Sequence, residues 1–200
     1  MVHKGGDPRK GNYFIITPEG KPTVALTEIQ QGLKPLLDKG LLGGLTIPPN
    51  AKPIATLIKS GELAAAQTAL AGLKSDGPSG EFKKALLDRF AELRKSKREL
   101  FDELVKAEKP WDAYKAGQSY VRCFPKADDV SKVKSAVETL KMNALVKSNL
   151  SARTSFMQVA TLAFSSKSKS GAADQAGPAL DQIVKKYADT EFGRYASSMK

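Results

Sequence analysis

Four cationic side chains lie close together near the middle of this 200-residue chain, and cations at such density can contact the phosphates of a polyanion. They are Arg94, Lys95, Lys97 and Arg98. Acidic residues flank them, and the pairs Lys95–Glu99 and Arg98–Asp102 have the i, i+4 spacing of ion pairs on one helix face. A solvated helix face therefore explains the cluster better than a dedicated site does, with contact to nucleic acid or another polyanion as the alternative.

The single cysteine, Cys123, and the single histidine, His3, limit thiol and metal chemistry. One cysteine cannot form an intrachain disulfide, and one cysteine with one histidine cannot supply the ligands of a structural zinc site. Cys123 is predicted near the C-terminal end of a helix, where the helix dipole disfavours a thiolate. We expect a packed or half-packed structural cysteine, no metal or other cofactor, and no disulfide reduction by this chain alone.

Carboxylates and glycines offer little catalytic machinery. The adjacent pair Asp128 and Asp129 suits a helix N-terminus, where the dipole favours negative charge. Residues 40–44 are glycine-rich but lack the Lys-Ser/Thr ending of a phosphate-binding loop. The tripeptide Asn149-Leu150-Ser151 matches the N-glycosylation acceptor pattern, which is common by chance, so we expect no glycan there. These patterns favour a protein that is not an enzyme.

Aromatic side chains gather in residues 111–124 beside two cations, and such a set can stack on single-stranded bases. The set is Trp111, Tyr114, Tyr120 and Phe124, with Lys115 and Arg122 nearby. Helical spacing places most of the rings near one face, and Gly117 would let a neighbouring helix approach that face. We therefore predict that the rings pack in a core rather than form a platform for bases.

The overall composition is that of a globular chain, with 41% hydrophobic and 26% charged residues. No run of about 18 apolar residues occurs, and the polar start of the chain is unlike a signal peptide. We expect no membrane span and, by default, a cytoplasmic protein. The net charge of +11 is spread along the chain, which weakens the nucleic-acid interpretation.

The longest predicted element is a helix that contains the cationic cluster. Apolar residues within 80–109 recur every three or four positions. Ser79 is predicted to cap this helix and Pro110 to stop it, which gives a length of about 45 Å at about 1.5 Å per residue. Because Lys97 interrupts the apolar stripe, a break near Ser96 is the alternative.

The predicted fold class is mainly α, and composition divides the chain into four segments. Residues 1–11 form a flexible leader, 12–40 a β-hairpin with a helix, 41–50 a linker rich in glycine and proline, and 51–200 an array of antiparallel helices. Short turns join these helices without a fixed internal period, as in an irregular helical repeat. The predicted helices span 53–59, 61–74, 80–109, 111–124, 128 or 129 to 145, 151–165, 172–187 and 190–198, with a loop at 165–171.

Residues 13–21 read YFIITPEGK and lead into a returning strand and a helix, an order that resembles the closing β-β-α of a thioredoxin-like fold. The resemblance covers about residues 11–40. In that family a Cys-x-x-Cys and a cis-proline loop precede this strand; neither is present here, and Gly11-Asn12 stands where Thr-Pro is usual. The helical remainder is similar to extensions of multidomain bacterial thioredoxin-like proteins, and residues 183–192 resemble the end of a tetratricopeptide-type helix pair. The resemblance implies a fragment or a degenerate family member without thiol-exchange residues.

Two functions follow from these patterns. The first is a non-catalytic helical interaction or scaffold module with an unidentified protein partner, indicated by amphipathic helices without converging polar groups. The alternative is a basic helical protein that binds nucleic acid or another polyanion, indicated by the net charge and the cluster at residues 94–98.

Overall fold

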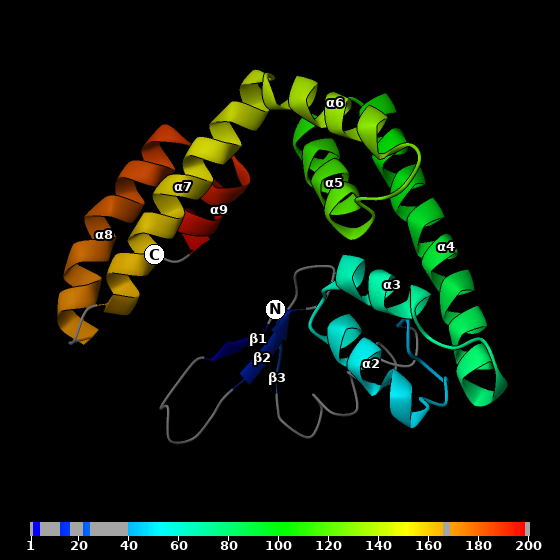
Figure 1. Ribbon diagram of the computed structural model, residues 1–200. Helices are drawn as coiled ribbons and strands as arrows, with labels where there is room; N and C mark the ends of the chain where they lie inside the picture. Colours follow the sequence, from blue (N-terminus) through cyan, green and yellow to red (C-terminus); the bar gives the residue numbers. More distant parts are fainter. Residues whose placement is uncertain (1, 5–12, 17–21, 25–39, 166–168, 199–200) are drawn as a thin grey trace. The chain divides into compact units, whose positions relative to one another are not determined.

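Helices dominate the structure, a computed structural model that describes residues 2–4, 13–16, 22–24, 40–165 and 169–198 (Figure 1). A short 3-10 helix, Pro49–Ala51, precedes the α-helices. These are α2 (Lys52–Lys59), α3 (Leu63–Ala71), α4 (Gly77–Lys106), α5 (Pro110–Cys123), α6 (Val130–Lys141), α7 (Ala144–Ser165), α8 (Lys169–Lys186) and α9 (Glu191–Ser198). The predicted fold class, mainly α, is confirmed.

Three short strands lie in the N-terminal part: β1 (Val2–Lys4), β2 (Tyr13–Ile16) and β3 (Pro22–Val24). They pair antiparallel in the order β1-β2-β3. The turn expected at residues 18–21 and the helix expected after residue 27 lie outside the described residues. The hairpin, its following helix and the leader therefore stay predictions.

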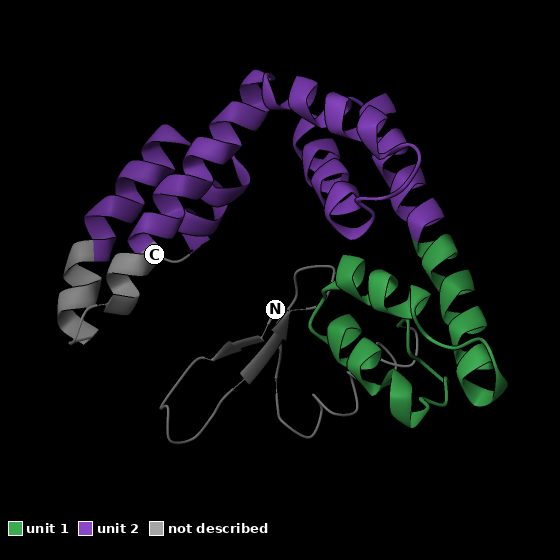
Figure 2. Ribbon diagram, in the orientation of Figure 1, with its two compact units in different colours: residues 1–93 green, residues 94–200 purple. Residues whose placement is uncertain are grey.

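The chain forms two compact units, residues 1–93 (unit 1) and 94–200 (unit 2), and α4 contributes residues to both (Figure 2). In unit 1, α2 packs against α3. The apolar stripe predicted for the long helix is buried in its first half, together with one side of the two shorter helices. The buried side chains are Ile54, Ala55, Ala66, Leu70, Phe82, Leu86 and Phe90.

Residues 41–50, predicted as a linker, are held against other parts of unit 1. Arg89 Nη1 of α4 donates hydrogen bonds to the carbonyl oxygens of Leu41 (3.0 Å) and Gly43 (2.7 Å). At the other end, Ser79 Oγ donates to Asn50 Oδ1 at 2.9 Å. This segment is therefore packed rather than an open tether, and the domain boundary expected there stays a prediction.

Helix α4 begins earlier than the sequence predicted and has no break near Ser96. It starts at Gly77, with Pro78 in the first turn, where the missing N–H needs no partner. Ser79 consequently lies inside the helix and does not cap it. Lys97 interrupts the apolar stripe without breaking the helix, because lysine is itself a good helix former. Its long side chain reaches a polar partner on α5. The 30 residues correspond to about 45 Å.

The C-terminal end of α4 is a Schellman motif centred on a glutamate. Glu108 has a positive φ of 53°, its N–H donates to Val105 O (3.2 Å), and the N–H of Lys109 donates to Leu104 O (3.1 Å). This turn ends the helix before the predicted limit at Lys109. The left-handed conformation costs a residue with a Cβ about 1 kcal/mol.

Replacing Glu108 by glycine is expected to stabilise unit 2 by about 0.5–1 kcal/mol, because glycine adopts the left-handed conformation without a Cβ penalty. Urea denaturation followed by the fluorescence of Trp111, the single tryptophan, measures the effect. The control is Glu103→Gly on the exposed side of the same helix, which should destabilise by about 1 kcal/mol. The same sign of change at both positions would contradict the interpretation.

Unit 2 contains the second half of α4 and helices α5 to α9 (Figure 2). Helix α5 packs on α6, α7 packs on α8 and α9, and α5 also contacts α7. One set of buried side chains comes from α4, α5, α6 and the turn after α5: Phe101, Trp111, Tyr114, Tyr120, Phe124, Val133 and Val137. A second cluster, from α7, α8 and α9, is built around Val159, Ile183 and Ala196.

Gly117 lies where α4, α5 and α6 meet. A Cβ at this position would overlap Val137 Cγ2 and lie 2.8 Å from Phe101 Cε2. The prediction that Gly117 permits the close approach of a neighbouring helix is therefore confirmed.

Two helix boundaries in unit 2 differ from the sequence prediction. The helix expected over 129–145 is divided between α6 and α7. The N–H of Leu145 donates to Asn143 Oδ1 at 2.9 Å, the capping geometry with which asparagine starts a helix. In addition, α8 begins at Lys169, within the segment 165–171 that was predicted as a loop.

Candidate functional site

The four cations predicted as a polyanion contact do not form one free basic face. Lys97 Nζ donates to a serine hydroxyl of α5 at 3.0 Å, and Arg98 forms ion pairs with two carboxylates. Arg94 and Lys95 are exposed, and Lys95 Nζ lies 3.9 Å from Glu99 Oε1. Both predicted i, i+4 ion pairs are present, whereas the polyanion contact stays a prediction.

The Arg98 cluster consists of Arg98, Asp102, Tyr120 and Asp129. Arg98 Nε donates to Asp102 Oδ2 at 2.9 Å, and Arg98 Nη1 donates to Asp129 Oδ2. Tyr120 OH donates to Asp129 Oδ1 at 2.5 Å. Asp129 occupies the predicted cap position of α6, but its side chain makes no capping hydrogen bond, because its carboxylate binds Arg98 and Tyr120 instead. The cluster ties α4 to α5 and to the start of α6.

The protonation states of this cluster are set by its own contacts. The hydrogen bond from Tyr120, supported by Arg98, lowers the pKa of Asp129 although burial opposes the shift. Burial and the hydrogen bond to Asp129 raise the pKa of Tyr120 to about 12. Near neutral pH the carboxylate is ionised and the phenol is protonated. Neither group is suited to proton transfer, so the cluster has the character of a structural tie.

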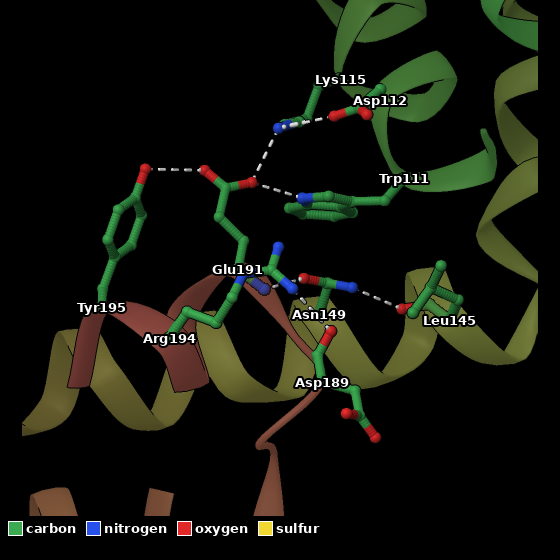
Figure 3. Close-up of polar contacts among 9 residues, drawn as sticks. All are labelled: Trp111, Asp112, Lys115, Leu145, Asn149, Asp189, Glu191, Arg194 and Tyr195. Atoms are coloured by element: carbon green, nitrogen blue, oxygen red, sulfur yellow. Dashed lines mark hydrogen bonds and ion pairs between the residues drawn. The ribbon is translucent and has the colours of Figure 1, made fainter. Parts of the chain in front are cut away.

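The Glu191 cluster consists of Trp111, Asp112, Lys115, Glu191 and Tyr195, and it joins α5 to α9 (Figure 3). Glu191 Oε2 accepts hydrogen bonds from Trp111 Nε1 (2.6 Å) and Lys115 Nζ (2.7 Å). Glu191 Oε1 accepts one from Tyr195 OH at 3.2 Å. Lys115 Nζ also lies 3.0 Å from Asp112 Oδ1 and 5.4 Å from the centre of the Trp111 ring. One carboxylate thus receives three side-chain donors from two helices.

The contacts in the Glu191 cluster favour the charged forms of Glu191 and Lys115. Burial raises the pKa of Glu191, but the hydrogen bonds from Lys115 and Trp111 outweigh it, so the net shift is downward. Burial likewise lowers the pKa of Lys115, but Glu191 and Asp112 outweigh it, and the net shift is upward. Glu191 and Lys115 are therefore both charged near neutral pH and form a structural ion pair, so neither is suited to act as a general acid or base.

The start of α9 is fixed by two buried polar side chains. Asn149, 2% exposed, accepts a hydrogen bond at Oδ1 from the N–H of Glu191 (2.9 Å) and donates from Nδ2 to Leu145 O (2.9 Å), as Figure 3 shows. Thr190 Oγ1 accepts from the N–H of Gly193 at 3.0 Å, which is the usual side-chain cap of a helix N-terminus. The amide of the glycosylation pattern is therefore buried, and both its oxygen and its nitrogen take part in hydrogen bonds.

A shallow groove with a volume of about 640 Å³ lies between α5 and α6. Its lining combines cations, amide and hydroxyl groups, and two valines: Lys115, Gln118, Ser119, Val121, Arg122, Lys134, Val137 and Glu138. Of the three cations, Lys115 is engaged by the Glu191 cluster. Arg122 and Lys134 form no ion pair with any residue whose position the structure describes. We call this surface the α5–α6 groove.

The aromatic set and Cys123 lie in the interior of the structure. Trp111, Tyr114, Tyr120 and Phe124 are all buried, which confirms the core interpretation of the aromatic set. Cys123 is 7% exposed, as expected for a packed cysteine. His3 lies in the strand β1, and the structure describes only its backbone.

Within residues 40–165 and 169–198 and the three strands, no group of three or more His, Cys, Asp or Glu side chains could hold a metal ion. None of the helices in this described part is long and apolar enough to cross a membrane. Comparison of the chain with protein-family models, curated proteins and solved structures finds no match.

Sequence reasoning named some of the residues that line the α5–α6 groove and that hold α9, but it did not predict that they come together. Glu191 and Trp111 are separated by 80 positions, and no short spacing pattern connects them. Arg122 lies beside Cys123 and the aromatic set in the sequence, and neither neighbour indicates a groove shared with Lys134. The one available signal was Asn143, whose residue type is typical of a helix start and locates the boundary between α6 and α7.

Proposed function

We propose that this chain is a non-catalytic helical interaction module that binds a protein partner through the α5–α6 groove. The observation that supports the proposal is the combination, in one groove, of apolar side chains, hydrogen-bonding groups and two cations without ion-pair partners in the described chain. Protein-binding surfaces combine an apolar centre with a polar rim in this way. The Arg98 and Glu191 clusters fix α5 on its neighbours, so the groove is formed before a partner arrives, which lowers the cost of binding.

The proposal includes the architecture indicated by the sequence. It treats the helices as an irregular, tetratricopeptide-like helical repeat and the N-terminal strands as a remnant of a thioredoxin-like domain. Helix pairs joined by short turns support the first part, since α5 packs on α6 and α7 packs on α8. The buried position of Cys123 supports a chain that performs no thiol exchange.

A displayed library of random peptides, selected against the full chain, tests the proposed function. Peptides are selected for binding to the wild-type chain and counter-selected against Gln118→Trp, in which an indole fills the groove without changing the charge. The matched control is Gln158→Trp on an exposed position of α7, outside the groove. We expect peptides that bind the wild type and the control but not the Gln118 variant. If every enriched peptide binds all three proteins equally, the groove is not the binding site.

A second candidate function is binding of nucleic acid, which the net charge of +11 favours. Neutralised phosphates release counterions, so the affinity would fall steeply with salt. Anisotropy titrations of labelled single-stranded and duplex DNA at low and moderate salt measure this slope. Absence of binding at low salt, where non-specific attraction is strongest, would remove this candidate.

A further inference from the structure

The α5–α6 groove carries more positive charge than its own chain neutralises. Its lining holds Lys115, Arg122 and Lys134 against one carboxylate, Glu138. Glu138 Oε2 lies 3.5 Å from Lys141 Nζ, so it is already shared with a cation outside the groove. Lys115 is engaged by Asp112 and Glu191, which leaves the charges of Arg122 and Lys134 uncompensated within the described chain. A ligand with at least two negative charges complements this wall of the groove.

The other residues that line the groove favour a ligand that carries an apolar group between its negative charges. Val121 on α5 is half-buried and supplies the accessible apolar surface of the groove, whereas Val137 on α6 is only 6% exposed and lies beneath it. Ser119 Oγ accepts a hydrogen bond from Lys97, which leaves the hydroxyl proton able to donate to a ligand. Gln118 Nε2 donates to Tyr114 OH at 2.6 Å, so its carbonyl oxygen can accept. The groove thus offers apolar contact, a donor and an acceptor beside the two cations.

We infer that the α5–α6 groove binds an acidic amphipathic segment of a partner protein, whose carboxylates contact Arg122 and Lys134 and whose apolar side chain contacts Val121; this inference rests on the proposed function. A guanidinium matches a carboxylate with two parallel hydrogen bonds, and an ammonium accepts a second carboxylate with less directional preference. An aspartate- or glutamate-rich helix with one apolar stripe can contact the two cations and Val121 together.

The same lining is poorly suited to nucleic acid. Single-stranded bases bind by stacking on exposed aromatic rings, and the aromatic rings of α5, those of Trp111, Tyr114 and Tyr120, are buried. Duplex binding relies on many phosphate contacts along a continuous basic surface. In the α5–α6 groove only Arg122 and Lys134 are uncompensated, and they lie beside the methyl groups of Val121, which contribute nothing to phosphate binding. An acidic protein segment therefore fits the groove better than a phosphate backbone does.

The test measures fluorescence anisotropy of a labelled peptide of glutamate, leucine and alanine, with the leucines at helical spacing, on titration with the full chain. Its counterpart carries lysine in place of every glutamate. We expect the acidic peptide to bind and the basic one not to, with affinity that falls between about 50 and 200 mM salt. The double variant Arg122→Glu with Lys134→Glu should lose about tenfold or more in affinity, because both attractions become repulsions.

The matched control is Lys126→Glu with Lys132→Glu, which changes the net charge equally at two exposed positions outside the groove lining. It should retain nearly all binding if the groove is the site. Equal losses in both double variants, or equal binding of the basic peptide, would overturn the inference. Tighter, groove-dependent binding of a single-stranded DNA oligomer would overturn it in favour of nucleic acid. Groove-dependent peptides that carry no acidic residues would refute the acidic segment while leaving the proposed function intact.

Discussion

Replacing Gly117 by alanine is expected to lower the free energy of unfolding of unit 2 by about 1–3 kcal/mol, although alanine is the better helix former by about 1 kcal/mol. The new methyl group would overlap Val137 Cγ2 and lie 2.8 Å from Phe101 Cε2. Val137 is 6% exposed and Phe101 is 3% exposed, so both belong to the core and cannot move aside into solvent. The overlap forces α5 away from α4 and α6, and this repacking outweighs the gain in helix propensity.

The control for this prediction is Gly72→Ala at the C-cap of α3, where the backbone is right-handed helical and a Cβ would lie at an ordinary contact distance of 3.6 Å from Ala69 O. Alanine at that exposed position should stabilise the protein by up to about 1 kcal/mol. Urea denaturation followed by circular dichroism and by Trp111 fluorescence compares the two variants. Stabilisation by Gly117→Ala would show that the three helices approach less closely than the structure places them.

Replacing Glu191 by alanine is expected to destabilise unit 2 by about 1–3 kcal/mol, because it leaves the indole N–H of Trp111 without its acceptor in a buried position. Glu191→Gln should cost less, since an amide oxygen can still accept that hydrogen bond, and the difference between the variants separates the hydrogen bond from the charge. The control is Glu138→Gln, which removes an exposed ion pair with Lys141 and should change stability by less than about 1 kcal/mol.

The Glu191 contact also predicts a pH dependence. Because the folded-state pKa of Glu191 lies below its unfolded value near 4.5, the charge of Glu191 stabilises the protein above that pH. This contribution is lost as the pH falls from about 4.5 through the folded pKa. Urea midpoints measured across this acidic range should fall less for Glu191→Gln than for the wild type. Parallel curves for the two proteins would contradict the assignment, since Asp129 contributes equally to both.

The helical character of the chain was predictable because it depends on local patterns. The apolar stripe of α4, the i, i+4 ion pairs of Lys95 and Arg98, and the close approach at Gly117 all follow from helical spacing. The break considered near Ser96 did not occur. A lysine in an apolar stripe suggests an interruption when its partner is unknown, and the partner, Ser119, is 22 positions away.

The features that were not predictable depend on tertiary contacts. The pair Asp128 and Asp129 was expected to supply a cap and a first-turn charge at the start of α6. The Asp129 carboxylate instead binds Arg98 and Tyr120, because a charge-assisted hydrogen bond is stronger than a cap to a backbone N–H. The groove likewise arises from two helices that bring Arg122 and Lys134 to one surface. Neither residue is unusual in its own segment, since exposed cations are common on helices.

The engagement of Asn149 has a practical consequence for producing the protein in a secretory host. Oligosaccharide transfer to this asparagine, before the chain folds, would remove the acceptor for the N–H of Glu191 and place a bulky sugar at a position that is 2% exposed. Glycosylated molecules would then fail to form the start of α9 and would be retained as misfolded chains. Asn149→Gln would itself disturb the buried contacts, whereas Ser151→Ala removes the acceptor pattern at an exposed position and leaves the asparagine in place. Secretion yield should therefore recover with the serine variant.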